Sequence, residues 1–222
     1  MSILSDVGAI FSAVASNDAW AIREALSADA AWYLGTAVAV VGGLALAGLY
    51  RAAPFVERYL ERTVMVVSYL AVALIIFWGV IDRFVFSNQQ PWSTTIPPLL
   101  FMIMAWFGAT YNVRLRTHLS FSEFRSRMAR PAQFACLMMD AALWFIFSVI
   151  VMVTTARAAA LSASNFQIVL GTDNTMQWWF LVTAPVAFLL MVARTFQNMM
   201  EDIGNLRSGQ PLIKQAVIGG DV

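Results

Sequence analysis

The sequence predicts an all-α polytopic membrane protein: a bundle of transmembrane helices with a short amphipathic helix on the membrane surface. Of the 222 residues, 60% are hydrophobic and only 12% are charged, whereas a soluble domain carries about 25% charged residues. The mean hydropathy is +0.70. Apolar runs of membrane-spanning length follow one another along the chain, and basic residues collect in the connections between them.

Five apolar runs are long enough to cross a hydrocarbon core of about 30 Å, which requires roughly 20 helical residues. They are residues 32–50, 64–86, 96–112, 134–156 and 178–193. The first run is rich in glycine, which weakens a helix but permits close helix packing in lipid. Proline inside the last run is expected to kink it, because proline removes one helical hydrogen bond.

The distribution of basic residues predicts the topology. Eleven of the fourteen Lys and Arg residues fall in three segments, at 51–63, at 111–131 and from Arg194 to the C-terminal end. The positive-inside rule places all three segments in the cytoplasm. The acidic N-terminal segment 1–30 is then expected outside, with the C-terminus inside.

The segment 111–131 holds five arginines and predicts a short surface helix. Ser120 and Glu123 fit a capping box. Because aromatic residues recur at helical spacing beside basic ones, an amphipathic helix over 120–129 is expected to lie on the inner membrane surface and to attract anionic lipid. The expected lipid contacts are Phe121, Phe124, Arg125 and Arg127. A disordered basic loop is the alternative.

The sequence lacks the residues that most cofactors require. His118 is the only histidine, so the chain alone cannot hold a haem between two histidines. Cys136 is the only cysteine, which excludes an intrachain disulfide and a Cys/His zinc or iron–sulfur site. No Ser, Cys or Asp has an obvious catalytic partner either. We expect no catalysis, no cofactor, no metal and no nucleic-acid partner.

Three sites place charge in or near the predicted spans. Asp140 lies six residues past the start of the fourth run, about 9 Å inside. A buried acid in lipid is costly, so it has two interpretations: a protonated or arginine-paired carboxyl at a subunit contact, which is favoured, or an ion or proton site. Asp82 and Arg83, at the outer end of the second run, could snorkel or bond a neighbouring helix, and Arg157 is expected to snorkel at the outer end of the fourth.

Two segments carry a more specific pattern. The first, IDRFVFSNQQPWSTTIPPLLFMIMAWFGATYNVR, contains an Arg–Phe pair, a Pro-Trp-Ser turn, and small residues leading into an arginine-rich loop. The second, MQWWFLVTAPVAFLLMVAR, contains a Trp pair, a proline and a terminal arginine. Over about residues 60–200, this order resembles the DctQ-type small membrane subunit of tripartite ATP-independent periplasmic (TRAP) transporters. Two departures are Thr94 and Thr95, where acidic residues are common in that family, and an extra first span.

The resemblance implies a division of the chain and a role for it. Residues 1–30 would be a periplasmic segment, 31–50 an extra transmembrane helix, 51–203 a DctQ-like four-helix domain and 204–222 a cytoplasmic tail. The candidate interface residues are Arg83, Trp92, Asp140, Trp178, Trp179 and Pro185.

In such a system, a periplasmic binding protein delivers a carboxylate-bearing solute to a large, sodium-driven membrane subunit. The small subunit serves as its scaffold in the bacterial inner membrane. The outer loops 86–95 and 158–177 are expected to face the binding protein. Two other classes stay open: a membrane anchor of a redox complex, and a small stand-alone channel or transporter that uses Asp140.

Overall fold

The computed structural model describes residues 3–116 and 125–213, and their secondary structure is helical apart from one isolated β-bridge between Ile168 and Met176. The helices are α1 (Ile3–Ser16), α2 (Ala19–Ser27), α3 (Ala30–Ala52), α4 (Pro54–Phe84), α5 (Trp92–Leu115), α7 (Arg130–Ser164), α8 (Trp178–Leu181) and α9 (Thr183–Ser208). The predicted all-α membrane bundle is confirmed.

Within the described residues, five helical units are long and apolar enough to cross a membrane, and they coincide with the five predicted runs: α3, α4, α5, α7 and α8–α9. Three of them extend well beyond the predicted bounds, with α8–α9 continuing to Ser208. α4 has 31 residues and α7 has 35. Pro54 and Pro131 stand in their first turns, where a proline needs no hydrogen-bond partner and its fixed φ favours helix initiation.

The last span is interrupted near its start. Val182 separates α8 from α9, and Pro185 stands in the first turn of α9. The proline has no N–H for the carbonyl four residues earlier, and its ring crowds that carbonyl. The interruption therefore falls one turn before the proline.

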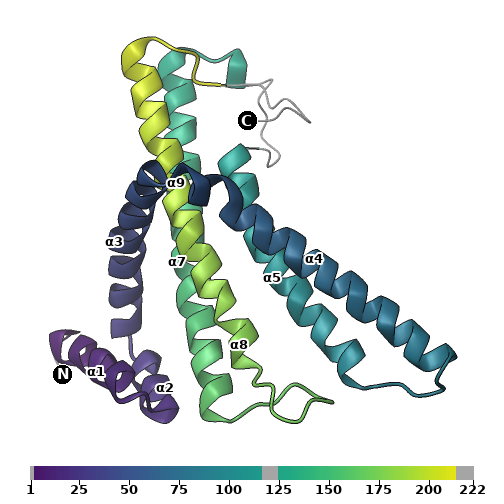
Figure 1. Cartoon of the computed structure of the whole chain (residues 1–222). Coiled ribbons are helices and arrows are strands. Elements are labelled where there is room, and N and C mark those ends of the chain that lie inside the picture. The colour runs from purple at the N-terminus through teal and green to yellow at the C-terminus, as the bar shows by residue number, and fades with distance from the viewer. Residues whose placement is uncertain (1–2, 117–124, 214–222) are drawn as a thin grey trace.

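The helices form a central unit and a divergent hairpin (Figure 1). α9 packs along α7, and α3 packs on α9. The close approach of α3 depends on Gly43, where an added Cβ would lie 2.6 Å from Val192 Cγ1. α4 packs mainly on α5, and this hairpin diverges from the α7–α9 pair toward the end that carries the α4–α5 loop.

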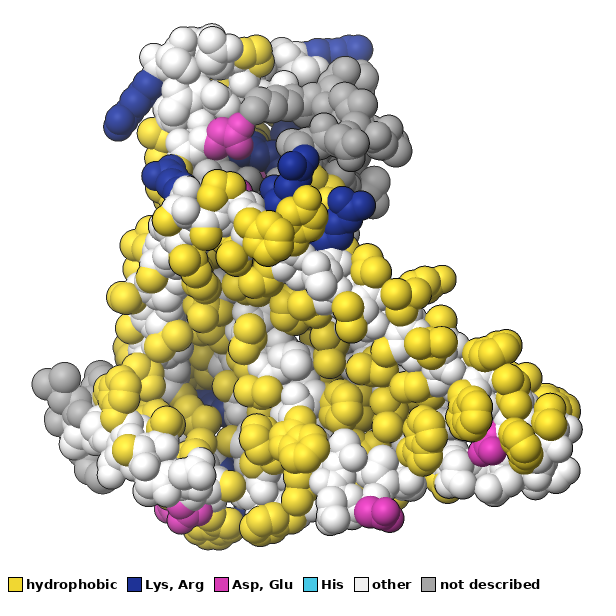
Figure 2. All heavy atoms as spheres, in the orientation of Figure 1, with side chains coloured by type: hydrophobic (Ala, Val, Ile, Leu, Met, Phe, Trp, Pro, Cys, Tyr) yellow, Lys and Arg dark blue, Asp and Glu magenta, His cyan; other side chains and the backbone are white. Residues whose placement is uncertain are grey.

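Charge and apolar surface are segregated along the molecule (Figure 2). Apolar side chains cover the middle, and Lys and Arg gather around the end where α3 gives way to α4. We name this the basic end, and the opposite end, with the α4–α5 and α7–α8 loops, the far end. This is the pattern of a membrane protein with one strongly positive side.

The N-terminal region contains two helices that the sequence did not predict. α1 and α2 pack on each other and on the start of α3. Asp18 caps α2, its side chain accepting a hydrogen bond from Trp20 N at 2.9 Å. Both helices are shorter than a span, so a search for runs of about 20 apolar residues passes over them.

The predicted surface helix at 120–129 is only partly covered by the structure. Phe121 and Phe124 lie outside the described residues. Arg125 and the residues that follow it are described, and they connect directly to the start of α7.

Candidate functional site

A buried arginine on α9 holds the bundle together near its basic end. From the sequence, Arg194 was expected to be a cytoplasmic charge at the end of the last span. Its side chain is instead fully buried. Its Nε and Nη2 atoms each donate to one carboxylate oxygen of Glu61 on α4, both at 2.8 Å. Glu61 is also fully buried. Paired, planar hydrogen bonding of this kind is the strongest form of an ion pair.

Further contacts complete what we call the arginine junction, formed by Tyr50, Glu57, Glu61, Arg194 and Gln197. Arg194 Nη1 donates to Gln197 Oε1 at 2.8 Å and to Glu57 Oε1 at 3.3 Å. The guanidinium carbon lies 3.8 Å from the ring centroid of Tyr50, whose hydroxyl donates to Glu61 Oε1 at 3.2 Å. The junction thus satisfies the buried charge from three helices, α3, α4 and α9.

A fourth helix joins through the backbone of Glu57. Its carbonyl accepts hydrogen bonds from Arg194 Nη2 at 2.8 Å and from Arg114 Nη1, on α5, at 2.5 Å. The junction therefore lies where the α4–α5 hairpin leaves the central unit. These contacts tie α4 to both α5 and α9 at this point.

Sequence reasoning missed the acids of this junction. Glu57 and Glu61 lie within the segment 51–63, whose arginines mark it as a basic connection. Their spacing of four residues, which puts both on one helix face just before an apolar run, was the available signal.

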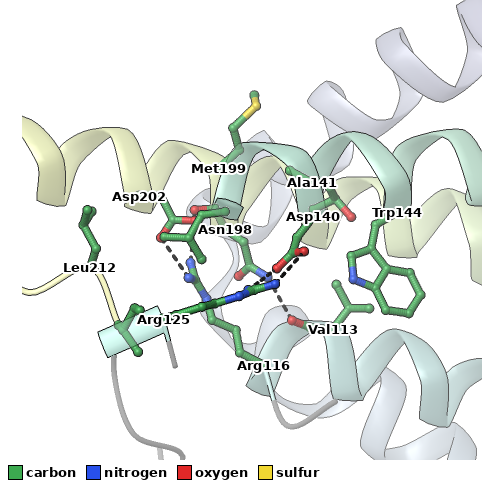
Figure 3. Close-up of a pocket in the computed structure, with 13 residues that line it drawn as sticks. Val113, Arg116, Arg125, Asp140, Ala141, Trp144, Asn198, Met199, Asp202 and Leu212 are labelled. Carbon is green, nitrogen blue, oxygen red and sulfur yellow. Dashed lines mark hydrogen bonds and ion pairs between the residues drawn. The ribbon is translucent and has the colours of Figure 1, made fainter. Parts of the chain in front are cut away.

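A second polar cluster surrounds a cavity of about 80 Å³ at the basic end, between α5, α7 and α9 (Figure 3). Arg125 donates to both carboxylate oxygens of Asp140, with Nη2 to Oδ1 at 3.0 Å. Arg116 Nη1 donates to Asp202 Oδ1 at 2.8 Å. The hydrogen bond to Asp140 raises the pKa of the Arg125 guanidinium above its usual value, so this arginine stays charged.

This cluster contains two of the predicted residues, Arg125 and Asp140. Arg125 was expected to contact lipid, but it points into the cavity, because a nearby carboxylate is a strong, fixed partner. Asp140 has both oxygens paired with that arginine. No group of three or more potential metal ligands occurs among residues 3–116 and 125–213. Arg127, also expected at the membrane surface, is exposed.

The remaining predicted residues lie at the far end, away from Asp140 (Figure 1). Arg83 is exposed and lines a groove of about 670 Å³ between α4 and α5. Its guanidinium carbon lies 5.7 Å from the ring centroid of Phe84. Trp92 opens α5 and is half-buried. Trp178 and Trp179 meet edge to face, with ring centroids 6.3 Å apart.

Asp82, beside Arg83, does not reach the surface. It is 8% exposed, and its Oδ2 atom has no hydrogen-bond partner among the described residues. The possibility that it snorkels is therefore wrong, since helix packing covers it.

The two loops at the far end touch each other. Thr95 Oγ1, in the first turn of α5, donates to the carbonyl of Leu170 at 2.7 Å. Gly171 has φ +79°, and an added Cβ would lie 2.6 Å from Trp92 N. The loop expected at 158–177 is shorter than predicted, because α7 continues to Ser164. Thr95, one of the departures from the family pattern, thus makes the contact between loops.

Arg157 also differs from expectation. It does not snorkel from the end of its span but binds the N-terminal region. Its Nε donates to the carbonyl of Leu26 at 2.7 Å, and Nη2 to that of Ala28 at 3.0 Å. The guanidinium carbon lies 5.3 Å from the ring centroid of Trp32. These carbonyls end α2, so the arginine satisfies acceptors that the helix leaves open.

Comparison with known proteins agrees with this architecture. The profile of the DctQ component of tripartite ATP-independent periplasmic transporters matches residues 72–205. The chain is also similar to the sialic acid TRAP transporter small permease protein SiaQ of Vibrio cholerae, with 22% identity over 162 residues, 71% of this chain and 91% of that protein. Since the profile covers more than half of the sequence, the chain belongs to the DctQ component family of TRAP transporters, whose members are transporter components and not enzymes.

Proposed function

We propose that this small permease subunit is the membrane scaffold of a sodium-driven importer, and that a large transport subunit packs against it. The α4–α5 hairpin carries this proposal. Only 6% of the residues in the most apolar window of α4 are buried, against 50% in α8–α9. α4 packs mainly on α5, and an apolar helix face that is left uncovered suits lipid or a second membrane protein. The arginine junction would hold the hairpin at the angle that its partner requires.

The joined loops at the far end are the proposed contact for a periplasmic binding protein. Phe166 and Leu170 are exposed there, as are Val85 and Phe86, which follow α4. The hydrogen bond from Thr95 to Leu170 makes the two loops one surface. Exposed apolar side chains on a defined surface are typical of a protein contact.

Orientation follows from the charge distribution. The basic end would lie in the cytoplasm and the far end in the periplasm, with the chain in the bacterial inner membrane. The transported solute would carry a carboxylate. The similarity to a protein named for sialic acid, itself a carboxylate, supports this class of substrate.

The first test is purification. The tagged chain, extracted gently from native membranes, is expected to bring a large polytopic partner in one-to-one ratio, identified by mass spectrometry. Reconstituted with that partner and its binding protein, it should support uptake only with an inward sodium gradient. A flavoprotein or iron–sulfur partner would instead indicate a redox anchor, and conduction by the chain alone a stand-alone channel.

The second test addresses the hairpin surface. Leu74 on α4 and Val41 on α3 are matched in exposure, at 67% and 69%. Lipid accommodates a larger apolar side chain, but a packed protein interface does not. Leu74→Trp, combined with Leu70→Trp one turn earlier, is expected to lower the yield of the complex, whereas Val41→Trp leaves it unchanged. Equal yields would exclude this face of α4 as the interface.

A further inference from the structure

The N-terminal helix α1 presents an apolar face outward. Its inward residues, Ile10 and Ala13, are buried. On the outward side, Phe11 is 61% exposed and Val14 57%. Asp6 is the only charged residue in the helix. The exposed positions around the two large side chains are small and uncharged: Gly8, Ala9, Ser12 and Ala15. In water, Phe11 and Val14 would have no favourable contact on this face.

The helix is nevertheless fixed in place at the far end. α1 contacts α2 and α3, and Ile10 belongs to the same buried cluster as Ala30 and Ala31, in the first turn of α3. Arg157 of α7 binds the carbonyls at the end of α2. The α1–α2 pair is therefore held at the level where the α3 span begins.

The direction and length of α1 exclude a span. The helix has 14 residues. A helix of this length measures about 21 Å, against about 30 Å for the hydrocarbon core of a bilayer. Figure 1 shows α1 running outward from the foot of the bundle, across the direction of α3. A short helix at the end of a span, lying across it and apolar on its outer side, has the geometry of an interfacial helix.

We propose that α1 lies in the membrane interface at the far end, with its Phe11 and Val14 face inserted among the lipids. Two observations favour lipid over a protein partner. α1 contacts α3, which is long and apolar enough to cross a membrane and has Val38 and Val41 exposed. Trp20 and Tyr33, 61% and 59% exposed, stand in the first turns of α2 and α3. Aromatic residues of this kind are typical of a bilayer interface.

The chemistry of the contact is apolar rather than ionic. The segment 1–30 holds four acids and one arginine. Attraction to anionic headgroups therefore contributes nothing, and the association depends on buried apolar area. This helix lies outside the matched residues 72–205, so the inference does not depend on the role proposed above.

Spin-label accessibility in lipid nanodiscs tests the inference. The Cys136→Ala background receives single labels at Val14→Cys and Ala15→Cys, two exposed positions on either side of Phe11 around α1. Glu24→Cys, on the exposed polar side of α2, is the control. Collision with oxygen, which partitions into lipid, and with a water-soluble nickel chelate is measured for the chain alone and for the purified complex.

The labels on α1 are expected to favour oxygen strongly, and the Glu24 label to favour nickel, in both preparations. Nickel access at Val14 and Ala15 equal to that at Glu24 would overturn the inference and place α1 in water. Labels on α1 that become inaccessible to both reagents in the complex would overturn it as well, because a protein partner would then cover this face.

Discussion

Arg194 of α9 and Glu61 of α4 form a paired, fully buried ion pair 133 residues apart in sequence. Burying two charges costs free energy that their attraction offsets only when every hydrogen bond is made. Here Gln197, Glu57 and Tyr50 satisfy the remaining groups. We therefore expect the pair to contribute less to net stability than to the choice of one helix arrangement.

Removing one partner of this ion pair should strongly destabilise the protein. Arg194→Met leaves Glu61 charged and buried, and we expect a loss of about 3–5 kcal/mol in the free energy of unfolding. Thermal unfolding in detergent measures it. Arg207→Met, at the exposed end of the same helix, is the control and should be neutral.

The double variant Arg194→Met with Glu61→Leu separates specificity from stability. Because it removes both charges, it should recover most of the stability lost in the single variant. It should still assemble poorly with its partner if the junction fixes the hairpin angle. A double variant that is no more stable than the single one would contradict the account of an unpaired buried charge.

The second prediction concerns Asp140. If it is a structural partner of Arg125, Asp140→Asn should loosen the attachment of the segment before α7 to the bundle. Transport by the assembled complex should stay intact. Proteolysis at that segment, compared with uptake in proteoliposomes, distinguishes the two effects. Loss of uptake with an unchanged digestion pattern would favour the ion or proton site instead.

The pH dependence of this contact has a definite sign. The pKa of Arg125 is raised on folding, so its contribution to stability is present below the unfolded-state pKa and is lost only as the pH rises through the folded value. Both values lie far above neutrality. Deprotonation of this arginine is therefore not expected to change the digestion pattern around neutral pH.

The third prediction uses two glycines of α3. At Gly43, an added Cβ would lie 2.6 Å from Val192 Cγ1, whereas at Gly48 nothing lies within 4 Å. Gly43→Ala should destabilise the bundle by pushing α3 off α9, by about 1–3 kcal/mol. Gly48→Ala should instead be neutral or raise the unfolding temperature, since alanine favours the helix by about 1 kcal/mol. Equal effects at the two positions would refute the close α3–α9 contact.

The sequence predicted some features well because they depend on a single physical requirement. Spans follow from bilayer thickness, which any apolar run must match. The arginine junction was missed for a different reason. An arginine at the end of a span gives the same local sequence pattern in two different cases. It can face the cytoplasm or, like Arg194, bind a buried acid on another helix. Which partner it takes depends on tertiary packing, and no local pattern shows it.

The N-terminal helices show a second limit. α1 is apolar but too short to count as a span, and α2 has mixed polarity. Their place is set by Arg157, far along the chain on α7. In the same way, Arg125 was assigned to lipid because its partner Asp140 was treated separately as a charge within a span. An arginine-paired carboxyl was among the favoured interpretations of Asp140, but which arginine pairs with it was not predictable.

The last prediction concerns the contact between the far-end loops. Thr95→Val keeps the shape of the side chain but removes the hydroxyl that donates to the carbonyl of Leu170. Thr94→Val is the matched control, because the Thr94 hydroxyl bonds only within its own turn, to the carbonyl of Pro91 at 2.8 Å. Loss of one hydrogen bond costs about 1 kcal/mol. We therefore expect faster amide hydrogen exchange across residues 165–177 in the Thr95 variant alone.

The same pair of variants tests what the contact is for. If the joined loops form the surface that meets the binding protein, Thr95→Val should also raise the concentration of binding protein that gives half-maximal uptake, while Thr94→Val should not. The maximal rate should be unchanged, because the loops lie at the far end from the arginine junction that holds the hairpin. Faster exchange with unaltered binding-protein dependence would mean that the contact only orders the loops, and that the binding protein docks elsewhere.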